Sequence, residues 1–104
     1  MMYKLVFFVP PEHAETVKAA VFATGAGQIG DYEHCCFETL GRGQFRAMAH
    51  ANPFVGEAGQ LNHIEELRVE LVCRDELIAH AVAALRAAHP YEEPAFDVWR
   101  MADF

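Results

Sequence analysis

Hydrophobic and polar residues are spaced along the chain in patterns that predict alternating strands and helices. Residues 3–9 carry apolar side chains at both sets of alternating positions, as in a strand whose two faces are both covered. Residues 12–24 place apolar side chains at helical spacing, and Gly25 supplies the end of a predicted helix. Apolar residues alternate most regularly with charged ones from Glu65 to Cys73. That strand should turn one face towards helices and the other towards solvent or a partner.

The last third of the chain predicts a second helix and a final strand. Asp75 stands where an N-cap residue would begin a helix, and a hydrophobic stripe continues from Leu77 to Ala88. Residues 95–101 read as a strand. The order of elements predicts an α+β fold, a ferredoxin-like βαββαβ sandwich with an extra hairpin arm, in a single domain of residues 1–104.

The middle of the chain predicts the hairpin arm. Residues 32–39 are rich in aromatic and small apolar residues, and residues 44–49 alternate. We therefore expect Gly41-Arg42-Gly43 between them to form a hairpin turn. Residues 50–62 contain prolines and glycines without a sustained period, which predicts an irregular loop. We name residues 41–62 the arm.

Composition and charge narrow the classes of partner. The chain has 8 basic and 15 acidic residues, a formal net charge of −7, and no cluster of Lys or Arg, so we expect no nucleic-acid binding. The apolar run at residues 5–9 is too short to span a membrane. Three cysteines, an odd number, disfavour a disulfide framework and favour a reducing cytoplasm. The 53% share of hydrophobic residues is high for a small domain and suggests a buried oligomer contact.

Two sequence features look like binding motifs, but their context argues against that function. Residues 25–30 match G-x-G-x-x-G, but they follow a predicted helix and precede a strand, whereas dinucleotide binding needs the reverse order. Cys35 and Cys36 are adjacent, so in a strand their side chains point to opposite faces. His34 and Cys35 could join a metal site only with help from a neighbouring subunit.

The segment from His89 to Pro94 contains a histidine, a tyrosine and two glutamates together with two prolines. The predicted topology brings this segment to one edge of the sheet, next to polar residues from other segments. Imidazoles and carboxylates together suit a divalent ion such as zinc, with copper or nickel as competitors. The predicted metal ligands are His89, Glu92, Glu93, His63 and Glu66. The alternative is that all of these are solvated loop residues, and His50 and His80 look incidental.

The chain resembles a known family over most of its length. The resemblance rests on residues 27–32, on His34-Cys35, on the Gly41–Phe45 and Ala51–Glu57 segments, on residues 65–70 and on His89–Asp97. These segments are similar to the YqfO-like domain found alone or inserted in the NGG-interacting-factor family, whose members bind two metal ions. The resemblance implies a fold like those of CutA and the nitrogen-regulatory PII proteins, which typically form trimers with their sheets facing inward. The dimetal centre of that family belongs to the enclosing domain, whose ligand motifs are not found in this sequence.

These observations together predict a non-enzymatic oligomeric module, a homotrimer, that binds a divalent metal ion or small ligand. It would signal or act as a scaffold by contacting a protein target through the arm, residues 41–62. One alternative is a metal-assisted hydrolase with Glu92 or Glu93 as the general base. A second alternative is a purely structural plug in a larger assembly.

Overall fold

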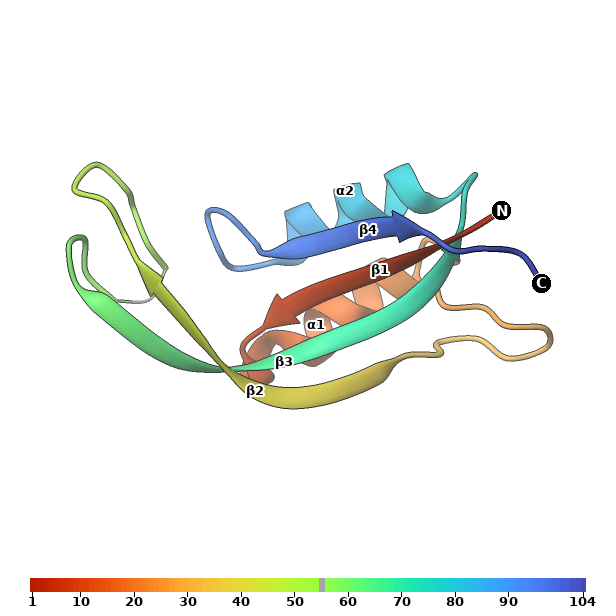
Figure 1. The fold of residues 1–104 in the computed structure, drawn as a ribbon, viewed down its shortest axis with the longest axis horizontal. Coiled ribbons are helices and arrows are strands. Elements are labelled where there is room, and N and C mark those ends of the chain that lie inside the picture. The colour runs from red at the N-terminus through yellow and green to blue at the C-terminus, as the bar shows by residue number, and fades with distance from the viewer. Residues whose placement is uncertain (55) are drawn as a thin grey trace.

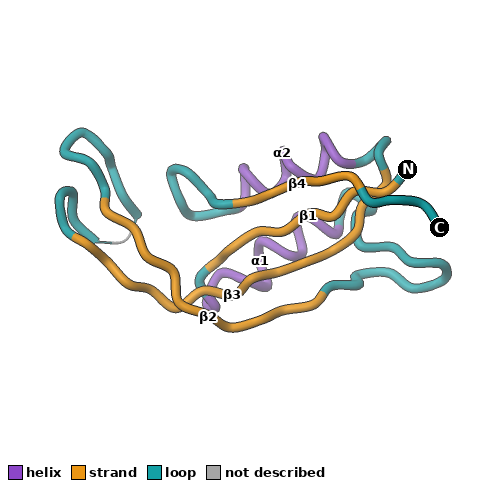
Figure 2. Tube along the Cα trace, in the orientation of Figure 1, coloured by secondary structure: helices purple, strands orange, loops and turns teal. Residues whose placement is uncertain are grey.

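The computed structural model describes residues 1–54 and 56–104. Four strands form one antiparallel sheet in the order β2-β3-β1-β4, and both helices lie on one face of it (Figures 1 and 2). This arrangement confirms the predicted ferredoxin-like α+β fold. The elements are β1 (Met2–Val9), α1 (Pro11–Phe22), β2 (Phe37–Arg46), β3 (Leu61–Arg74), α2 (Ile78–Ala88) and β4 (Phe96–Arg100).

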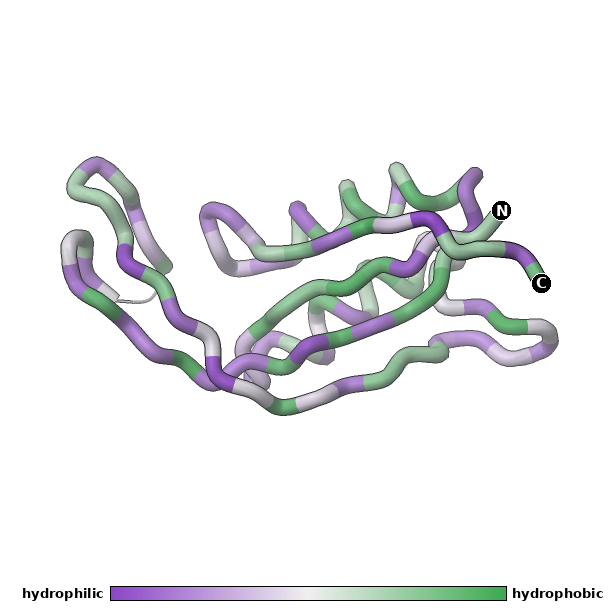
Figure 3. Tube along the Cα trace, viewed as in Figure 1, coloured by the Kyte–Doolittle hydropathy of each residue, from purple (hydrophilic) through white to green (hydrophobic). Residues whose placement is uncertain are grey.

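The core lies between the helices and the two central strands. Alternate residues of β1 and β3 point towards the helices, because side chains on a strand alternate between its two faces. Figure 3 shows that β1 is hydrophobic along most of its length. The buried residues that form the core cluster are Leu5, Phe7, Val9, Ala14, Val17, Val21, Ala26, Val69, Leu71, Cys73, Ala81 and Leu85. The predicted buried face of β3 is therefore confirmed.

The predicted turn at Gly41-Arg42-Gly43 is wrong, because β2 runs straight through these residues and pairs with β3 along its whole length. Gly43 has a packing role instead. A Cβ atom at this position would collide with the carboxylate of Glu66, whose side chain lies across the strand. Glycine inside a strand often marks such a close approach rather than a turn.

The hairpin turn lies further along the chain, between β2 and β3. Residues 47–54 and 56–60 lie in the irregular connection, as predicted, whereas residues 61 and 62 already belong to β3. Val55 lies outside the described residues. The distal halves of β2 and β3 curve away from the helices and face the α2–β4 connection, at the end of the molecule opposite both termini (Figure 1). The molecule extends 46 Å along its longest axis.

The ends of α2 are set by neighbouring backbone rather than by a side-chain cap. Asp75 is not the N-cap: its backbone N–H bonds the carbonyl of Met1, a turn follows, and Leu77 occupies the N-cap position. The helix ends at His89, which is extended because it precedes Pro90. The second helix therefore begins two residues later than the sequence predicted.

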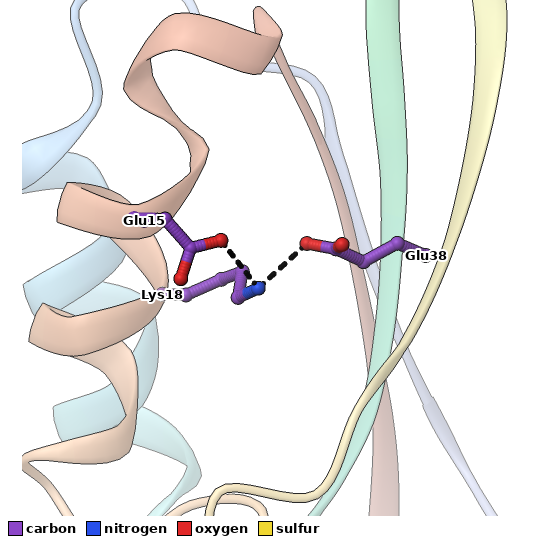
Figure 4. A network of polar contacts seen from close by, with 3 residues as sticks. All are labelled: Glu15, Lys18 and Glu38. Carbon is purple, nitrogen blue, oxygen red and sulfur yellow. Dashed lines mark hydrogen bonds and ion pairs between the residues drawn. The ribbon is translucent and has the colours of Figure 1, made fainter.

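Lys18 connects α1 to β2. Its Nζ lies 2.8 Å from a carboxylate oxygen of Glu15 and 2.7 Å from one of Glu38 (Figure 4). Burial lowers the pKa of Lys18, but the hydrogen bonds that its ammonium donates to both carboxylates outweigh burial and raise the pKa above its usual value. This network holds the helix over the edge strand of the sheet.

Candidate functional site

A pocket of about 530 Å³ lies between the arm and the connection from α2 to β4. We call residues 89–95, which form that connection, the link. The volume is within the roughly 300–1,000 Å³ of typical small-ligand sites. The pocket is lined by Gln44, Phe45, Arg46, Ala47, Met48, His50, Ala51, Pro53, Phe54, Glu66, Tyr91, Glu92, Glu93 and Ala95.

Three of the five predicted metal ligands meet at this pocket. Glu66 comes from β3, and Glu92 and Glu93 come from the link. A carboxylate oxygen of Glu92 accepts a hydrogen bond of 3.3 Å from the backbone N–H of Asn52. The link is thereby tied to the loop of the arm. The fold thus brings together carboxylates that lie about 26 positions apart in sequence.

Tyr91 and Glu66 form a partly buried pair on the pocket wall. The Tyr91 hydroxyl is buried and lies beside the Glu66 carboxylate, although the two do not form a hydrogen bond of good geometry. Burial raises the pKa of Tyr91 above its usual value, and the nearby Glu66 carboxylate adds to that rise. Burial also raises the pKa of Glu66, which Tyr91 partly offsets. The carboxylate and the phenol are thus both partly desolvated.

His89 differs from its predicted role, because both of its ring nitrogens are bonded to backbone. Nε2–H donates to the carbonyl of Phe8 at 2.7 Å, and Nδ1 accepts the N–H of Tyr91 at 3.1 Å. The residue is 6% exposed, and burial lowers its pKa. In this arrangement no lone pair of the ring is free for a metal. His89 instead holds the link against the end of β1.

His63 is placed away from the pocket. It pairs with Gln44 across the hairpin and is exposed. Its position is three residues from Glu66, so the two side chains leave the strand on opposite faces. Among residues 1–54 and 56–104, no group of three or more His, Cys, Asp or Glu side chains is placed to hold a metal ion. The metal-binding role of His89, Glu92, Glu93, His63 and Glu66 stays a prediction.

Several pocket residues were missed from the sequence. His50 looked incidental but lines the pocket. Phe54 has its ring centroid 5.5 Å from that of His13 and 6.3 Å from that of Tyr91, so the loop of the arm packs against the link and the start of α1. The available signals were the adjacent Pro53 and the fact that Phe54 is the one Phe, Tyr or Trp residue in the loop sequence.

His34 and Cys35 lie elsewhere, in the connection between α1 and β2. The ring of His34 stacks on Phe22 with centroids 5.0 Å apart and planes at 10°. His34 has a φ of 58°, which is unusual for a residue other than glycine. Neither residue lines the pocket between the arm and the link.

Comparison with known proteins places this chain within longer relatives. No family model matches the chain. A Mycobacterium tuberculosis protein named GTP cyclohydrolase 1 type 2 homolog is 50% identical over 98 residues, covering 94% of this chain and 26% of that protein. The namesake from Halalkalibacterium halodurans is 42% identical over 102 residues, covering 98% of this chain and 27% of the relative. The chain spans about a quarter of the length of these relatives.

Solved structures agree with the sequence comparison. A Bacillus cereus protein related to NIF3 superposes with a TM-score of 0.81 and 41% identity, over 98% of this chain and 26% of that one. The resemblance to the YqfO-like domain is confirmed. CutA from Archaeoglobus fulgidus, a periplasmic divalent cation tolerance protein, superposes on this chain with a TM-score of 0.72 and 16% identity, over 100% of this chain and 87% of CutA. That likeness shows a shared fold.

The segments that line the pocket lie at the end of the sheet from which the arm projects (Figure 1). Within the described residues, no helix has the length and apolar character needed to cross a membrane. The walls of the pocket come from the ends of β2 and β3 near the arm and from two connecting segments, one from β2 to β3 and one from α2 to β4.

Proposed function

We propose that this domain is an oligomeric, non-enzymatic module that binds a small ligand or a divalent metal ion in the pocket between the arm and the link. The observation that carries the proposal is the pocket itself, where apolar walls from the arm meet the carboxylates of Glu66, Glu92 and Glu93. Concave sites with apolar walls and a few convergent polar groups are the usual form of a ligand site.

The same geometry supports a regulatory or scaffolding role. The arm and the link touch through the Asn52–Glu92 hydrogen bond and the Phe54–Tyr91 contact. A ligand between them would contact both segments, so its binding would favour some positions of the arm over others. We propose that a protein target contacts the arm, residues 41–62, and so responds to this change in its position.

A divalent ion is one candidate for the ligand. Glu66, Glu92 and Glu93 supply oxygen ligands, and His50 supplies an imidazole on the same pocket wall. His89 would take part only by giving up its backbone hydrogen bonds. The names of the CutA relatives refer to divalent cation tolerance, which is a property of those proteins. For this chain, zinc, copper or nickel binding is a proposal.

Titration calorimetry with zinc tests the metal-ion form of this proposal. We expect the unmodified protein to bind zinc at pH 7.5 and Glu93→Gln to weaken that binding by about tenfold or more, because a neutral amide is a poorer ligand than a carboxylate. His80→Ala, in an exposed position on α2, is the matched control and should bind zinc unchanged. Equal affinity in both variants would place any bound zinc outside the pocket.

The open face of the sheet supports the proposed homotrimer. No helix among the described residues covers this face, where Phe37 is 68% exposed and Trp99 is 45% exposed. Val6 and Phe8 lie on the same face of β1. This face also carries the charged residues Lys4, Arg68, Glu70 and Asp97. Exposed aromatic side chains on a sheet face nevertheless mark a surface that another layer normally covers. We propose that two further copies of the chain supply that cover.

Light scattering at micromolar concentration tests the assembly. We expect the unmodified protein to have three times the mass of one chain and Trp99→Glu to have the mass of one chain, because a buried unpaired charge would oppose association. Asp97→Ala, a change to a less polar side chain on the same strand face, should remain trimeric. A single-chain mass for the unmodified protein would contradict the proposal.

Compartment and catalysis complete the proposed function. Cys35, Cys36 and Cys73 are free, which suits a reducing compartment such as the cytoplasm. The name of the relatives refers to proteins about four times as long as this chain. Our proposal therefore assigns the chain no cyclohydrolase step.

A further inference from the structure

The pocket between the arm and the link has two chemically different parts. Its apolar part comes from the arm and contains Phe45, Met48, Pro53 and Phe54. Its acidic part contains Glu66 on β3 together with Glu92 and Glu93 on the link. An occupant that satisfies both parts needs an apolar body and a polar or charged end.

The charges around the pocket indicate whether the polar end of the ligand is positive or negative. Three carboxylates line it against one guanidinium, that of Arg46. A cation would be attracted to this surface and an anion repelled from it. Aromatic rings from Phe54 and Tyr91 also lie on the pocket wall, and the faces of such rings attract ammonium groups.

The pair Tyr91 and Glu66 also favours a cation. The buried Tyr91 hydroxyl lies beside the Glu66 carboxylate, although the two do not form a hydrogen bond of good geometry. A cation beside Glu66 would stabilise the charged form of this partly buried carboxylate, and a charged carboxylate is a strong acceptor for the O–H of Tyr91. Binding of a cation would therefore strengthen the contact between Tyr91 and Glu66.

The apolar walls distinguish an organic cation from a metal ion. A divalent ion needs several oxygen or nitrogen ligands in close geometry, and the described residues offer no group of three so placed. It would make no contact with Phe45, Met48 or Phe54. An amine attached to an apolar group uses both parts of the pocket.

We propose that the ligand of this pocket is a primary amine with an aromatic or aliphatic body, its ammonium group bound by Glu66 and its body packed on Phe45, Met48 and Phe54. The proposal rests on the function proposed above and specifies its ligand class. Gly43 makes it possible, because only a residue without a Cβ lets the Glu66 side chain lie across β2. Glu92, which accepts a hydrogen bond from Asn52, would hold the wall closed beside the ligand.

Three probes with similar apolar bodies and different charges test the ligand class by titration calorimetry. They are 2-phenylethylamine, 2-phenylethanol and 3-phenylpropionate. We expect the amine to bind about tenfold or more tightly than the alcohol, since a hydrogen bond to a charged group contributes roughly 1.5–3 kcal/mol. The propionate should bind more weakly than both.

Matched variants test the role of Glu66. Glu66→Gln keeps the size of the side chain and should reduce amine affinity to that of the alcohol while leaving alcohol affinity unchanged. Glu65→Gln removes the same charge from an exposed neighbour that does not line the pocket, and should retain the preference for the amine. Tyr91→Phe removes only the hydroxyl, and its probe affinities can be measured instead if Glu66→Gln fails to fold.

The outcomes separate this proposal from the one on which it rests. Equal binding of amine and alcohol would overturn the amine class while supporting a ligand pocket. Zinc binding that depends on Glu93, without binding of any organic probe, would also overturn it while supporting the metal-ion form of the proposed function. Binding of neither zinc nor any probe would overturn both.

Discussion

Replacing Phe7 with Ala should lower the free energy of unfolding by about 3–5 kcal/mol, the usual cost of removing a fully buried aromatic ring. Phe7 is 0% exposed and is the largest of the fully buried side chains. It sits on the central strand β1, opposite Val69 of β3 and Phe96 of β4. The cavity would therefore open where the sheet and the helices meet, and denaturation in urea would measure the loss.

Phe104 provides the matched control for that measurement. It has the same side chain but is fully exposed at the end of the chain. Phe104→Ala should change the unfolding free energy by no more than about 0.5 kcal/mol, as for most surface substitutions. Similar losses for both variants would contradict the location of the core.

Replacing His89 with Ala should lower the free energy of unfolding by about 2–4 kcal/mol at pH 7.5, because it leaves two backbone groups without partners. These are the carbonyl of Phe8 and the N–H of Tyr91. The same change should loosen the link that carries Glu92 and Glu93, and so weaken binding in the pocket without removing any pocket residue. Urea denaturation measures the stability, and calorimetry with 2-phenylethylamine measures the binding.

The contribution of His89 should also depend on pH. Burial lowers the pKa of His89 in the folded protein below the ordinary value of 6.5, so its stabilising contribution is complete above about pH 6.5. As pH falls below that value, the unfolded chain takes up a proton that the folded protein resists, and the contribution is lost as pH falls through the lowered folded pKa. The difference between the unmodified protein and His89→Ala should therefore shrink from pH 7.5 to pH 5.

His80 is the control for both effects, because it is exposed on α2. We expect His80→Ala to leave the unfolding free energy within about 0.5 kcal/mol of the unmodified protein at both pH values. A difference for His89→Ala that stayed constant with pH would mean that His89 does not resist protonation in the folded protein.

Much of the fold could be predicted from local pattern. In β3, the alternation of apolar and charged residues shows which side chains face the core, because side chains on a strand alternate with a period of two. In α1, the apolar residues Ala14, Val17 and Val21 follow helical spacing and are buried as expected. Such patterns lie within a few residues, so they are readable without knowledge of distant contacts.

The candidate site could be predicted only in part. Glu92 and Glu93 lie in a segment between prolines that the sequence singled out, and the predicted topology brought Glu66 to the same edge. The aromatic wall was missed, because Phe54 reaches Tyr91 only after the arm curves back towards the link. Curvature of a long hairpin depends on twist accumulated along paired strands, which no local pattern records.

The sequence by itself determined the order of elements, the buried face of β3 and the position of Pro90, which follows the end of α2. Tertiary structure decided the roles of Gly43 and His89. Gly43 lies within a strand, where its missing Cβ leaves room for the side chain of Glu66, a residue distant in sequence. His89 is held by the carbonyl of Phe8, 81 positions away, which occupies the ring nitrogen that a metal would need. Both roles depend on partners brought close only by folding, and residue type alone cannot show whether a polar group will find such a partner.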